Sequence, residues 1–222
     1  MDNLRVPIIG FGAGGHARVM IEILRFDQRY ELAGLLDPRE ELRGESLLGI
    51  PVLGDDNLLP DLLTRGITHF FIGLGGTGNL NPRRKLYELA RSFALMPVDA
   101  IHPSVIISPS VQIGVGFSAM PNSVVNACAT IGENVILNTG AIIEHDCVIG
   151  SHVHIATGAR LASTVQVGEG AHIGAGATVR QCALIGAGAI VGVGAVVVKD
   201  VLPGVVVAGV PARPLIKRDT IA

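Results

Sequence analysis

The fold is decided by the stretch Ile131-Gly-Glu-Asn-Val-Ile-Leu137-Asn-Thr-Gly-Ala-Ile-Ile143-Glu-His-Asp-Cys-Val-Ile149-Gly. An aliphatic residue returns at every sixth position, and a second stripe of mostly small residues follows it four places later. Continued in both directions, the aliphatic stripe runs from Ile101 to Val197 and holds Ile, Leu or Val at sixteen of its seventeen positions. Neither an α-helix nor an alternating strand has this period. It predicts a parallel β-helix, in which a short strand turns a corner every six residues and three sides close one coil.

Composition divides the chain near residue 100. Residues 1–100 carry 24 of the 36 charged side chains and seven of the eight aromatic ones. Alternating apolar strands and helical spacings in this part, with one helix over 17–26, predict a small α/β, Rossmann-like domain with a parallel sheet. We therefore expect three parts: the α/β domain at 1–100, the β-helix at 101–208 and a C-terminal tail at 209–222.

Charge and cysteine content narrow the function classes. A formal charge of −2, from 17 basic and 19 acidic residues, gives no electrostatic reason to expect nucleic acid or an anionic membrane as a partner. Cys128, Cys147 and Cys182 form no close pair, which excludes a disulfide framework and fits a reducing compartment. The uncharged stretch 182–198 approaches the length of a membrane span, but its glycines and its six-residue period favour the β-helix.

A glycine-rich loop follows the first predicted strand. The pattern Gly10-x-Gly12-x-x-Gly15, followed by His16, opens a predicted helix, and Asp37 ends the next strand. Free backbone N–H groups at a helix N-terminus favour a phosphate, and a carboxylate at the next strand end can accept from a ribose or sugar hydroxyl. The pattern matches the dinucleotide fingerprint, but about one hundred residues make only one mononucleotide-binding half, which argues against NAD. A purely structural turn is the alternative.

His145 stands between Glu144 and Asp146 in a domain that is otherwise poor in charge. A carboxylate bound to an imidazole raises its basicity and fixes its tautomer, and a general base is built in this way. Strand alternation would point both acids away from His145, whereas a corner would override the alternation, so spacing leaves the partner open. A solvated corner without a catalytic role is the alternative interpretation.

Two further features lie in the second half. His154 and His172 are eighteen residues apart and occupy equivalent places in successive coils. Two histidines can begin a metal site, but no third ligand follows in their column, so we expect an outward-facing pair that is free to meet a ligand, and no metal. Beyond the repeat, the basic residues Arg213, Lys217 and Arg218 could meet a phosphate or form a solvated tail.

Three motifs together resemble a known family. The loop Gly10–His16, the segment Ile143–Gly150 and the closing Gly209–Arg213 resemble the nucleotide-sugar N-acetyltransferases of the bacillosamine and perosamine pathways, and the related sialic acid O-acetyltransferases. Leu48–Asp56 and Ala100–Ser104 extend the similarity nearly from end to end. The resemblance implies a left-handed parallel β-helix, a homotrimer as the working unit, and acetyl-CoA bound in the groove between neighbouring β-helices.

The resemblance also implies residue roles at the acyl-transfer site. His145 matches the general base, and Asp146 matches the residue that enhances its basicity. His154 matches a histidine that contacts the acetyl group of the cofactor. Ser163 stands where the family usually has a glycine whose backbone N–H faces the thioester carbonyl. The pantetheine path is lined near two small or aliphatic positions, Ala175 and Val193.

On the nucleotide side, the resemblance implies a phosphate loop made by Gly14, Gly15 and His16. Asp37 matches an acidic residue that binds the nucleoside. Some members have a second acid after it, where this chain has Pro38.

The expected activity is acetyl transfer from acetyl-CoA to the 4-amino group of a GDP- or UDP-linked amino sugar, in the cytoplasm, for surface polysaccharide or glycan synthesis. No covalent enzyme intermediate is expected, because a free amine is a good nucleophile and proximity supplies much of the rate. Cys147, on the stripe of small residues, is expected in the core. Three other hypotheses stay open: O-acetylation of a sugar or sialic acid hydroxyl, a nicotinamide oxidoreductase, and a non-catalytic nucleotide-binding scaffold.

Overall fold

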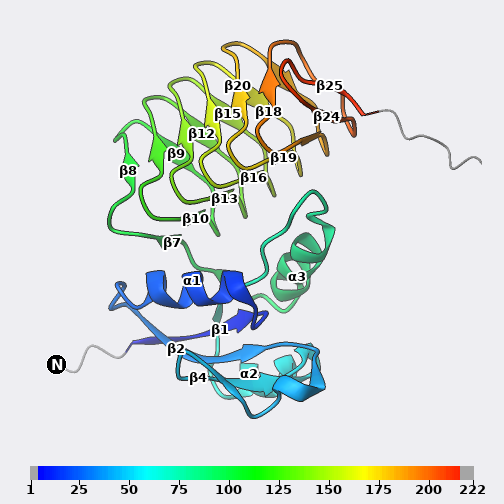
Figure 1. Ribbon diagram of the computed structural model, residues 1–222. Helices are drawn as coiled ribbons and strands as arrows, with labels where there is room; N and C mark the ends of the chain where they lie inside the picture. Colours follow the sequence, from blue (N-terminus) through cyan, green and yellow to red (C-terminus); the bar gives the residue numbers. More distant parts are fainter. Residues whose placement is uncertain (1–4, 216–222) are drawn as a thin grey trace, which may run out of the picture.

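A computed structural model describes residues 5–215, which form an α/β domain followed by a β-helix (Figure 1). The first domain holds one sheet with the strand order β3-β4-β2-β1-β5-β6, parallel except for the β3–β4 pair. Its strands are β1 (Val6–Phe11), β2 (Tyr30–Leu36), β3 (Ser46–Leu47), β4 (Ile50–Gly54), β5 (His69–Ile72) and β6 (Met96–Pro97). Its helices are α1 (Gly15–Leu24), α2 (Leu59–Thr64) and α3 (Asn81–Ser92), with short 3₁₀ turns at Glu40–Leu42 and Asp56–Leu58.

The β-helix has three faces, each a stack of strands of two or three residues that are parallel except for the last strand of one face. The face turned towards the first domain, here called the docked face, consists of β7 (Ala100–Ile101), β10 (Ser118–Ala119), β13 (Ile136–Leu137), β16 (His154–Ile155), β19 (His172–Ile173), β22 (Ile190–Val191) and β24 (Val206–Ala208), closed by antiparallel β25 (Arg213–Pro214). The second face consists of β8 (Ile106–Ile107), β11 (Val124–Val125), β14 (Ile142–Ile143), β17 (Arg160–Leu161), β20 (Thr178–Val179) and β23 (Val196–Val197). The third consists of β9 (Gln112–Ile113), β12 (Thr130–Ile131), β15 (Val148–Ile149), β18 (Gln166–Val167) and β21 (Leu184–Ile185).

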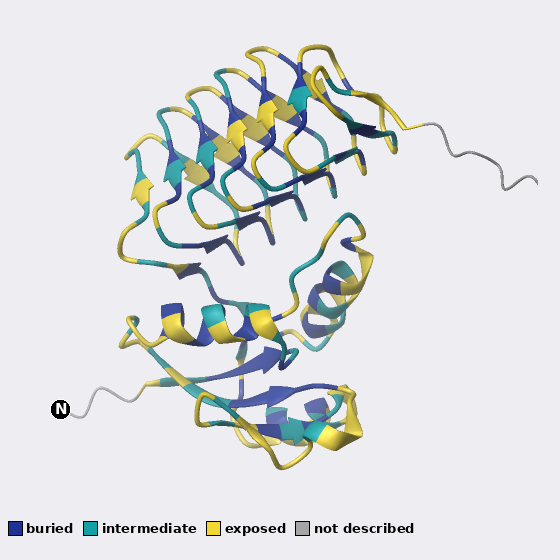
Figure 2. Cartoon of the chain, in the orientation of Figure 1, coloured by how far each residue is buried: buried dark blue, intermediate teal, exposed yellow. Residues whose placement is uncertain are grey.

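The period of six seen in the sequence is the period of these strands. Each face advances by eighteen residues per coil, so that His154 pairs with His172 and Ile155 with Ile173. The aliphatic stripe and the stripe of small residues both fill the interior, where Cys147 is fully buried, as expected (Figure 2). The prediction of a hexapeptide β-helix is therefore confirmed.

Corner residues adopt left-handed backbone angles at regular places. Glycines fill many of these corners, and Asn134, Asp146 and His152 occupy three others with φ of 54°, 58° and 61°. Asn and Asp tolerate this conformation better than most residues. A corner of this kind redirects the side chain, which strand alternation alone does not predict.

Helix α1 packs between the sheet and the docked face (Figure 1). Met20, Ile21 and Leu24 share one apolar cluster with Ala100 and Ile136 of the β-helix. Two polar contacts from α3 reach the same β-helix: the Tyr87 hydroxyl donates to Glu133 over 2.9 Å, and Arg84 pairs with Glu169 over 2.6 Å. The two parts are therefore joined by both apolar and polar contacts, although the division at residues 100 and 208 stays a prediction.

Two local predictions need adjustment. The helix expected over 17–26 spans Gly15–Leu24, because Gly14 is the N-cap and Gly15 already belongs to the first turn. The expected pair of basic residues Lys217 and Arg218 lies outside the described residues. Within the described range, no helix is long and apolar enough to cross a membrane.

Changing Gly150 to alanine is expected to lower the free energy of unfolding by about 1–3 kcal/mol. A Cβ atom at Gly150 would stand 2.7 Å from the backbone nitrogen of Glu169 in the next coil, and backbone cannot yield as a side chain does. Gly170→Asn is the matched control, because Gly170 has a left-handed φ of 66° that Asn tolerates and open space around it. Thermal unfolding by circular dichroism compares the two; equal melting temperatures would contradict the close stacking of coils.

Candidate active site

His145 lies at the corner between the second and third faces, after β14 and before β15. Its Nδ1 is 2.7 Å from Oδ2 of Asp146, and both side chains are about half exposed. The left-handed corner at Asp146 turns its carboxylate back onto the ring. Glu144 instead accepts from the amide of Asn126 over 3.0 Å. The partner that spacing left open is therefore Asp146.

This contact decides which ring nitrogen can take a proton. An ionised carboxylate only accepts hydrogen bonds, so the proton of neutral His145 sits on Nδ1. Nε2 then carries a free lone pair on an exposed edge of the molecule. A carboxylate behind Nδ1 and a free Nε2 form the arrangement of a general base.

Ser163 occupies the same corner one coil later. The backbone N–H of Thr164 donates to the His145 carbonyl over 2.9 Å, so the two corners are directly stacked. Within residues 5–215, the N–H of Ser163 itself has no hydrogen-bond acceptor. A free backbone donor thus lies one coil away from the base.

His154 projects from β16 towards the first domain and is only 5% exposed. Its Nδ1 is 2.8 Å from the carbonyl oxygen of Gly76, and its Nε2 is 3.2 Å from the amide nitrogen of Asn138. Because a carbonyl only accepts and an amide nitrogen only donates, the proton sits on Nδ1, and Nε2 accepts. Burial, with smaller contributions from His172 and Arg83, lowers the pKa of His154 to about 4, so the ring is neutral near pH 7.

The prediction that His154 and His172 are free to meet a ligand is wrong. The two rings do lie against each other, edge to face with centroids 5.0 Å apart, and both point out of the coil. Both are nevertheless buried, because the first domain covers the docked face and its Gly76 carbonyl binds His154. Among the residues that the structure describes, no cluster of three His, Cys, Asp or Glu side chains could hold a metal ion.

The loop between β5 and α3 contacts two of the predicted site residues, His16 and His154, although the sequence pattern did not single it out. It runs over 73–80 and contains Gly73, Gly75, Gly76 and Gly78. A glycine cluster directly after an apolar strand was the available signal, since the same pattern at Gly10–Gly15 was noticed. Asn138, which binds His154, was missed because nothing in its hexapeptide distinguishes it.

His16 lies where the two glycine-rich loops meet. It follows Gly14 and Gly15, around which a Cβ atom would find open space, and its ring is within van der Waals distance of a Cβ built on Gly75. Its Nε2 is enclosed without a hydrogen-bond partner in the described structure. Burial, followed by the charge of Arg83, lowers the pKa of His16 to about 3. The loop expected to bind phosphate therefore adjoins the docked face.

Asp37 braces the first glycine-rich loop. Its Oδ2 accepts from the Ala13 N–H over 2.8 Å, and the Arg39 guanidinium binds both carboxylate oxygens, each over 2.8 Å. The hydrogen bond from Arg39 lowers the pKa of Asp37 to about 2. Asp37 and Arg39 border a cleft of about 370 Å³ that extends to Asp55. The expected nucleoside contact therefore lies at this cleft, with Arg39 as a partner that spacing did not reveal.

One chain does not bring all the predicted site residues together. His145, Asp146 and Ser163 share the corner between the second and third faces, which in a triangular coil lies opposite the docked face. The loops that carry His16 and Gly76 lie against the docked face. Ala175, half-buried, and Val193, 78% exposed, lie in one column at the corner between the docked and second faces.

Low pH is expected to destabilise the protein through its buried histidines. In the folded state the pKa of His154 is about 4 and that of His16 about 3, against an ordinary value of 6.5. The unfolded chain therefore binds more protons below pH 6.5, and stability falls as pH drops from 6.5 towards 4. His154 alone accounts for on the order of 3 kcal/mol across this window. Urea unfolding of wild type and His154→Asn at pH 7 and pH 4.5 tests this; an unchanged pH dependence in the variant would contradict it.

Comparisons with known proteins agree with this architecture. Residues 7–90 match the PglD N-terminal domain, and residues 128–163 match the bacterial transferase hexapeptide family. A histidine-to-asparagine variant of perosamine N-acetyltransferase from Caulobacter crescentus, in complex with CoA and GDP-perosamine, is 40% identical, with a TM-score of 0.88 over 94% of this chain and 96% of that one.

Two other solved structures are similar over nearly the whole chain. The acetyltransferase domain of PglB from Neisseria gonorrhoeae, in complex with acetyl coenzyme A, is 36% identical over 96% of this chain and 100% of that one, with a TM-score of 0.87. WeeI from Acinetobacter baumannii is 31% identical over 94% and 100%, with a TM-score of 0.84. The fold and the family expected from the sequence are both confirmed, and the chain is an acyltransferase that belongs to the nucleotide-sugar N-acetyltransferase family of hexapeptide-repeat proteins.

Proposed function

We propose that this protein transfers the acetyl group of acetyl-CoA to the 4-amino group of a nucleotide-linked amino sugar. The observation that carries this is the His145–Asp146 pair, with a free Nε2, on a chain whose relatives bind acetyl-CoA in one case and CoA with GDP-perosamine in another. Both substrates belong to cytoplasmic metabolism, so the reaction is placed in the cytoplasm, in the synthesis of a surface polysaccharide or glycan.

The chemical step needs one base and one oxyanion donor. The amino nitrogen of the sugar forms a bond to the thioester carbon, and Nε2 of His145 takes the proton that this nitrogen loses. The tetrahedral oxyanion accepts a hydrogen bond from the backbone N–H of Ser163. When the C–S bond breaks, the proton on His145 goes to the CoA sulfur, and the base returns to its starting state. The serine hydroxymethyl group does not remove the backbone donor.

His154 is assigned to the wall of the acetyl pocket. Its single N–H is committed to Gly76, and its Nε2 accepts from Asn138. The neutral ring therefore has no second N–H with which to stabilise an oxyanion while these contacts hold. Oxyanion stabilisation is assigned to Ser163, and His154, which is buried with both ring nitrogens bound, is assigned only to the wall of the pocket.

The nucleotide is assigned to the first domain. Gly14, Gly15 and the start of α1 offer uncapped backbone N–H groups to the phosphates, with His16 at their side. The cleft beside Asp37 and Arg39 receives the nucleoside. The sugar then extends from the loop towards the β-helix.

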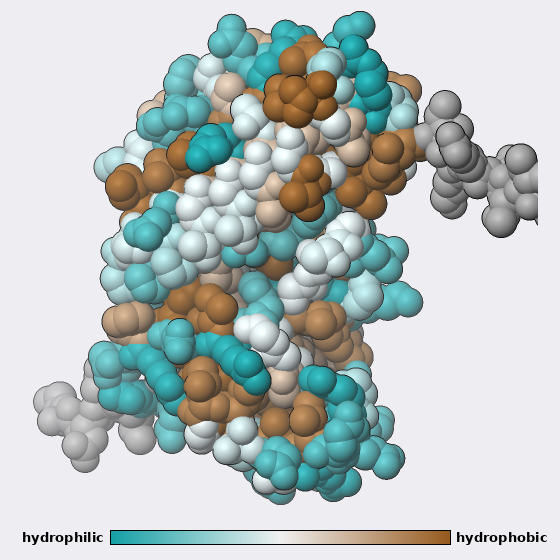
Figure 3. All heavy atoms as spheres, viewed as in Figure 1, coloured by the Kyte–Doolittle hydropathy of each residue, from teal (hydrophilic) through white to brown (hydrophobic). Residues whose placement is uncertain are grey.

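A homotrimer would complete the site. The base corner of one chain faces away from its own nucleotide loop, so a neighbouring chain must supply the other half. Exposed apolar side chains lie on the second and third faces, where Ile106, Val148 and Leu184 are 66%, 48% and 46% exposed. Apolar side chains also gather near the C-terminal end of the β-helix (Figure 3). The groove between chains, lined by Ala175 and Val193, would take the pantetheine arm, and sedimentation should give a trimeric mass.

The decisive test is thiol release from acetyl-CoA with GDP- and UDP-linked 4-amino sugars, beside the matching 4-hydroxy sugars. Release that requires the amine supports the proposal and also identifies the nucleotide. Release only with the hydroxy sugars would replace it with O-acetylation. No release with any acceptor, from a correctly folded trimer, would leave the scaffold hypothesis.

A further inference from the structure

Arg83 is a buried cation without an acidic partner. It stands in the first turn of α3, is 3% exposed, and forms no salt bridge within the described range 5–215. Burial lowers its pKa to about 9, which still leaves it mostly charged at pH 7. A buried charge that nothing neutralises is costly, so its surroundings must hold it through hydrogen bonds.

Backbone carbonyls at the end of β5 and in the loop 73–80 offset part of this cost. Nη1 of Arg83 donates to the carbonyls of Ile72 and Leu74, over 2.8 Å and 2.9 Å. The next carbonyl but one, that of Gly76, accepts from His154. The carbonyls of residues 72, 74 and 76 are therefore all bound by buried side chains. Arg83 of the first domain binds the first two, and His154 of the β-helix binds the third.

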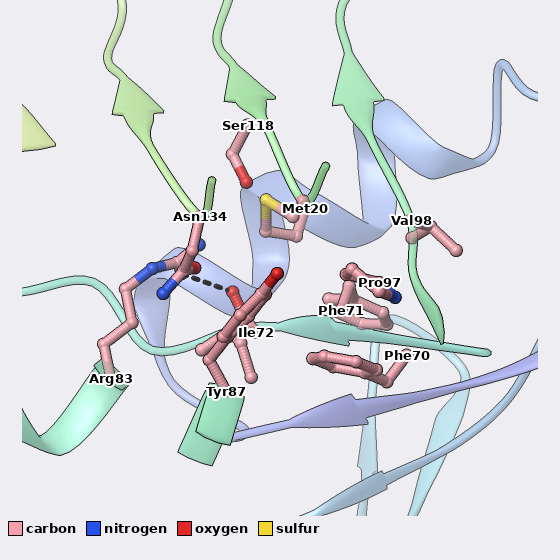
Figure 4. Close-up of a pocket in the computed structure, with 11 residues that line it drawn as sticks. Met20, Phe70, Phe71, Ile72, Arg83, Tyr87, Pro97, Val98, Ser118 and Asn134 are labelled. Carbon is pink, nitrogen blue, oxygen red and sulfur yellow. Dashed lines mark hydrogen bonds between the residues drawn. The ribbon is translucent and has the colours of Figure 1, made fainter. Parts of the chain in front are cut away.

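Arg83 also lines a small cavity between the two domains. The cavity leaves about 10 Å³ for the centre of a water molecule and is lined from one side by Phe71 and Arg83 and from the other by Ser118 and Asn134 (Figure 4). Nε of Arg83 and Oδ1 of Asn134 are both buried without a hydrogen-bond partner. One is a donor and the other an acceptor, and they belong to different domains.

Asn134 is placed firmly enough to serve as this acceptor. It occupies a left-handed corner of the β-helix, and its amide nitrogen is 2.9 Å from Nδ1 of His152, so its oxygen is the atom left without a partner. A space of this size holds one water, and an ordered water needs two to four polar partners. The Ser118 hydroxyl in the same lining offers the third.

We propose that one water molecule fills this cavity, accepting from Arg83 Nε–H and donating to Asn134 Oδ1, and that Arg83 is thereby a positioning residue for the sugar nucleotide. Through its carbonyl contacts Arg83 fixes the loop 73–80, and through the water it ties that loop to the β-helix. Because Gly75 of this loop lies beside His16, the bridge sets the distance between the phosphate loop and the acyl-transfer groove. This part of the inference rests on the proposed function.

The water itself can be tested without any activity. A high-resolution crystal structure of the full chain should show density about 2.7–3.2 Å from both Arg83 Nε and Asn134 Oδ1. The same density should persist in Asn134→Asp, which keeps an acceptor and tolerates the corner, and should disappear in Asn134→Gly. An empty cavity, or a direct contact between Arg83 and Asn134, would overturn the assignment of the water.

The positioning role is tested with Arg83→Met against its neighbour Arg84→Met. Arg84 is exposed and pairs with Glu88 and Glu169, so it is a matched control for loss of an arginine from the same helix. For Arg83→Met we expect the KM for the amino-sugar nucleotide to rise about 10-fold or more, with the KM for acetyl-CoA within about twofold of wild type. Arg84→Met should leave both constants near wild type.

Equal changes in both KM values, or none, would overturn the positioning role. If Arg83→Met does not fold, Asn134→Gly replaces it as the test variant, with Asn134→Asp as the control. Asn134→Gly should show the same selective rise in the KM for the amino-sugar nucleotide. Calorimetric binding of GDP and of UDP to the wild type and both arginine variants separates this inference from the reaction. If no acetyl transfer occurs but Arg83→Met alone weakens nucleotide binding, the positioning role stands and the proposed reaction fails.

Discussion

Changing His145 to alanine is expected to lower kcat for acetyl transfer by about two to four powers of ten. The free Nε2 of this ring is the group that would take the proton of the attacking amine, and Asp146 holds it in the correct tautomer. The KM for the nucleotide sugar should stay within about threefold, because the nucleotide is assigned to another part of the protein. Thiol release from acetyl-CoA at saturating acceptor measures the loss.

Two neighbouring carboxylates provide the controls. Asp146→Asn keeps the corner and a hydrogen-bond acceptor but removes the charge behind the imidazole, so we expect a loss of about tenfold. Glu144→Gln should stay near wild type, since Glu144 binds Asn126 and not the ring. Equal losses in the two variants would show that the partner of His145 is wrongly assigned. Full activity in His145→Ala would remove this residue as the base.

Mixing two inactive variants is expected to restore activity in about one of the three sites of each trimer that holds both variants. One variant, His145→Ala, lacks the base. The other, Gly15→Asp, places a negative charge in the phosphate loop, where its side chain finds open space and favours the helix N-terminus. An interface is intact when its base corner comes from the second variant and its nucleotide loop from the first.

The result distinguishes a site shared between chains from one within a chain. Co-expression with two affinity tags isolates mixed trimers, and each variant alone gives the baseline. A mixture of His145→Ala with Asp146→Ala should restore nothing, because both changes damage the same corner. Mixed trimers of His145→Ala and Gly15→Asp that stay at baseline would contradict the shared site, and with it the geometric reason for a trimer.

Periodicity predicted the β-helix well because each repeat packs only on its neighbours, so a local pattern determines the contact. Contacts between distant segments were harder. The burial of His154 depends on a carbonyl from Gly76, 78 residues earlier, and no pattern around either residue signals the other. At Asp146 the spacing left the partner of His145 open, since alternation describes strands and does not apply where the chain turns. At Asp37 the acid was identified, but the guanidinium two residues later takes both of its oxygens.

The coil of eighteen residues also limits how the sequence can change in length. A deletion of one residue after Ile149 would rotate every later side chain out of its stripe, so that core and surface positions exchange along the rest of the chain. Removal of one complete coil keeps both stripes and all three faces aligned and shortens the prism by a single rung. Insertions and deletions in this half are therefore expected to be tolerated only in whole coils of eighteen residues. The distance from the His145 corner to the C-terminal end of the β-helix can then change only in steps of one coil.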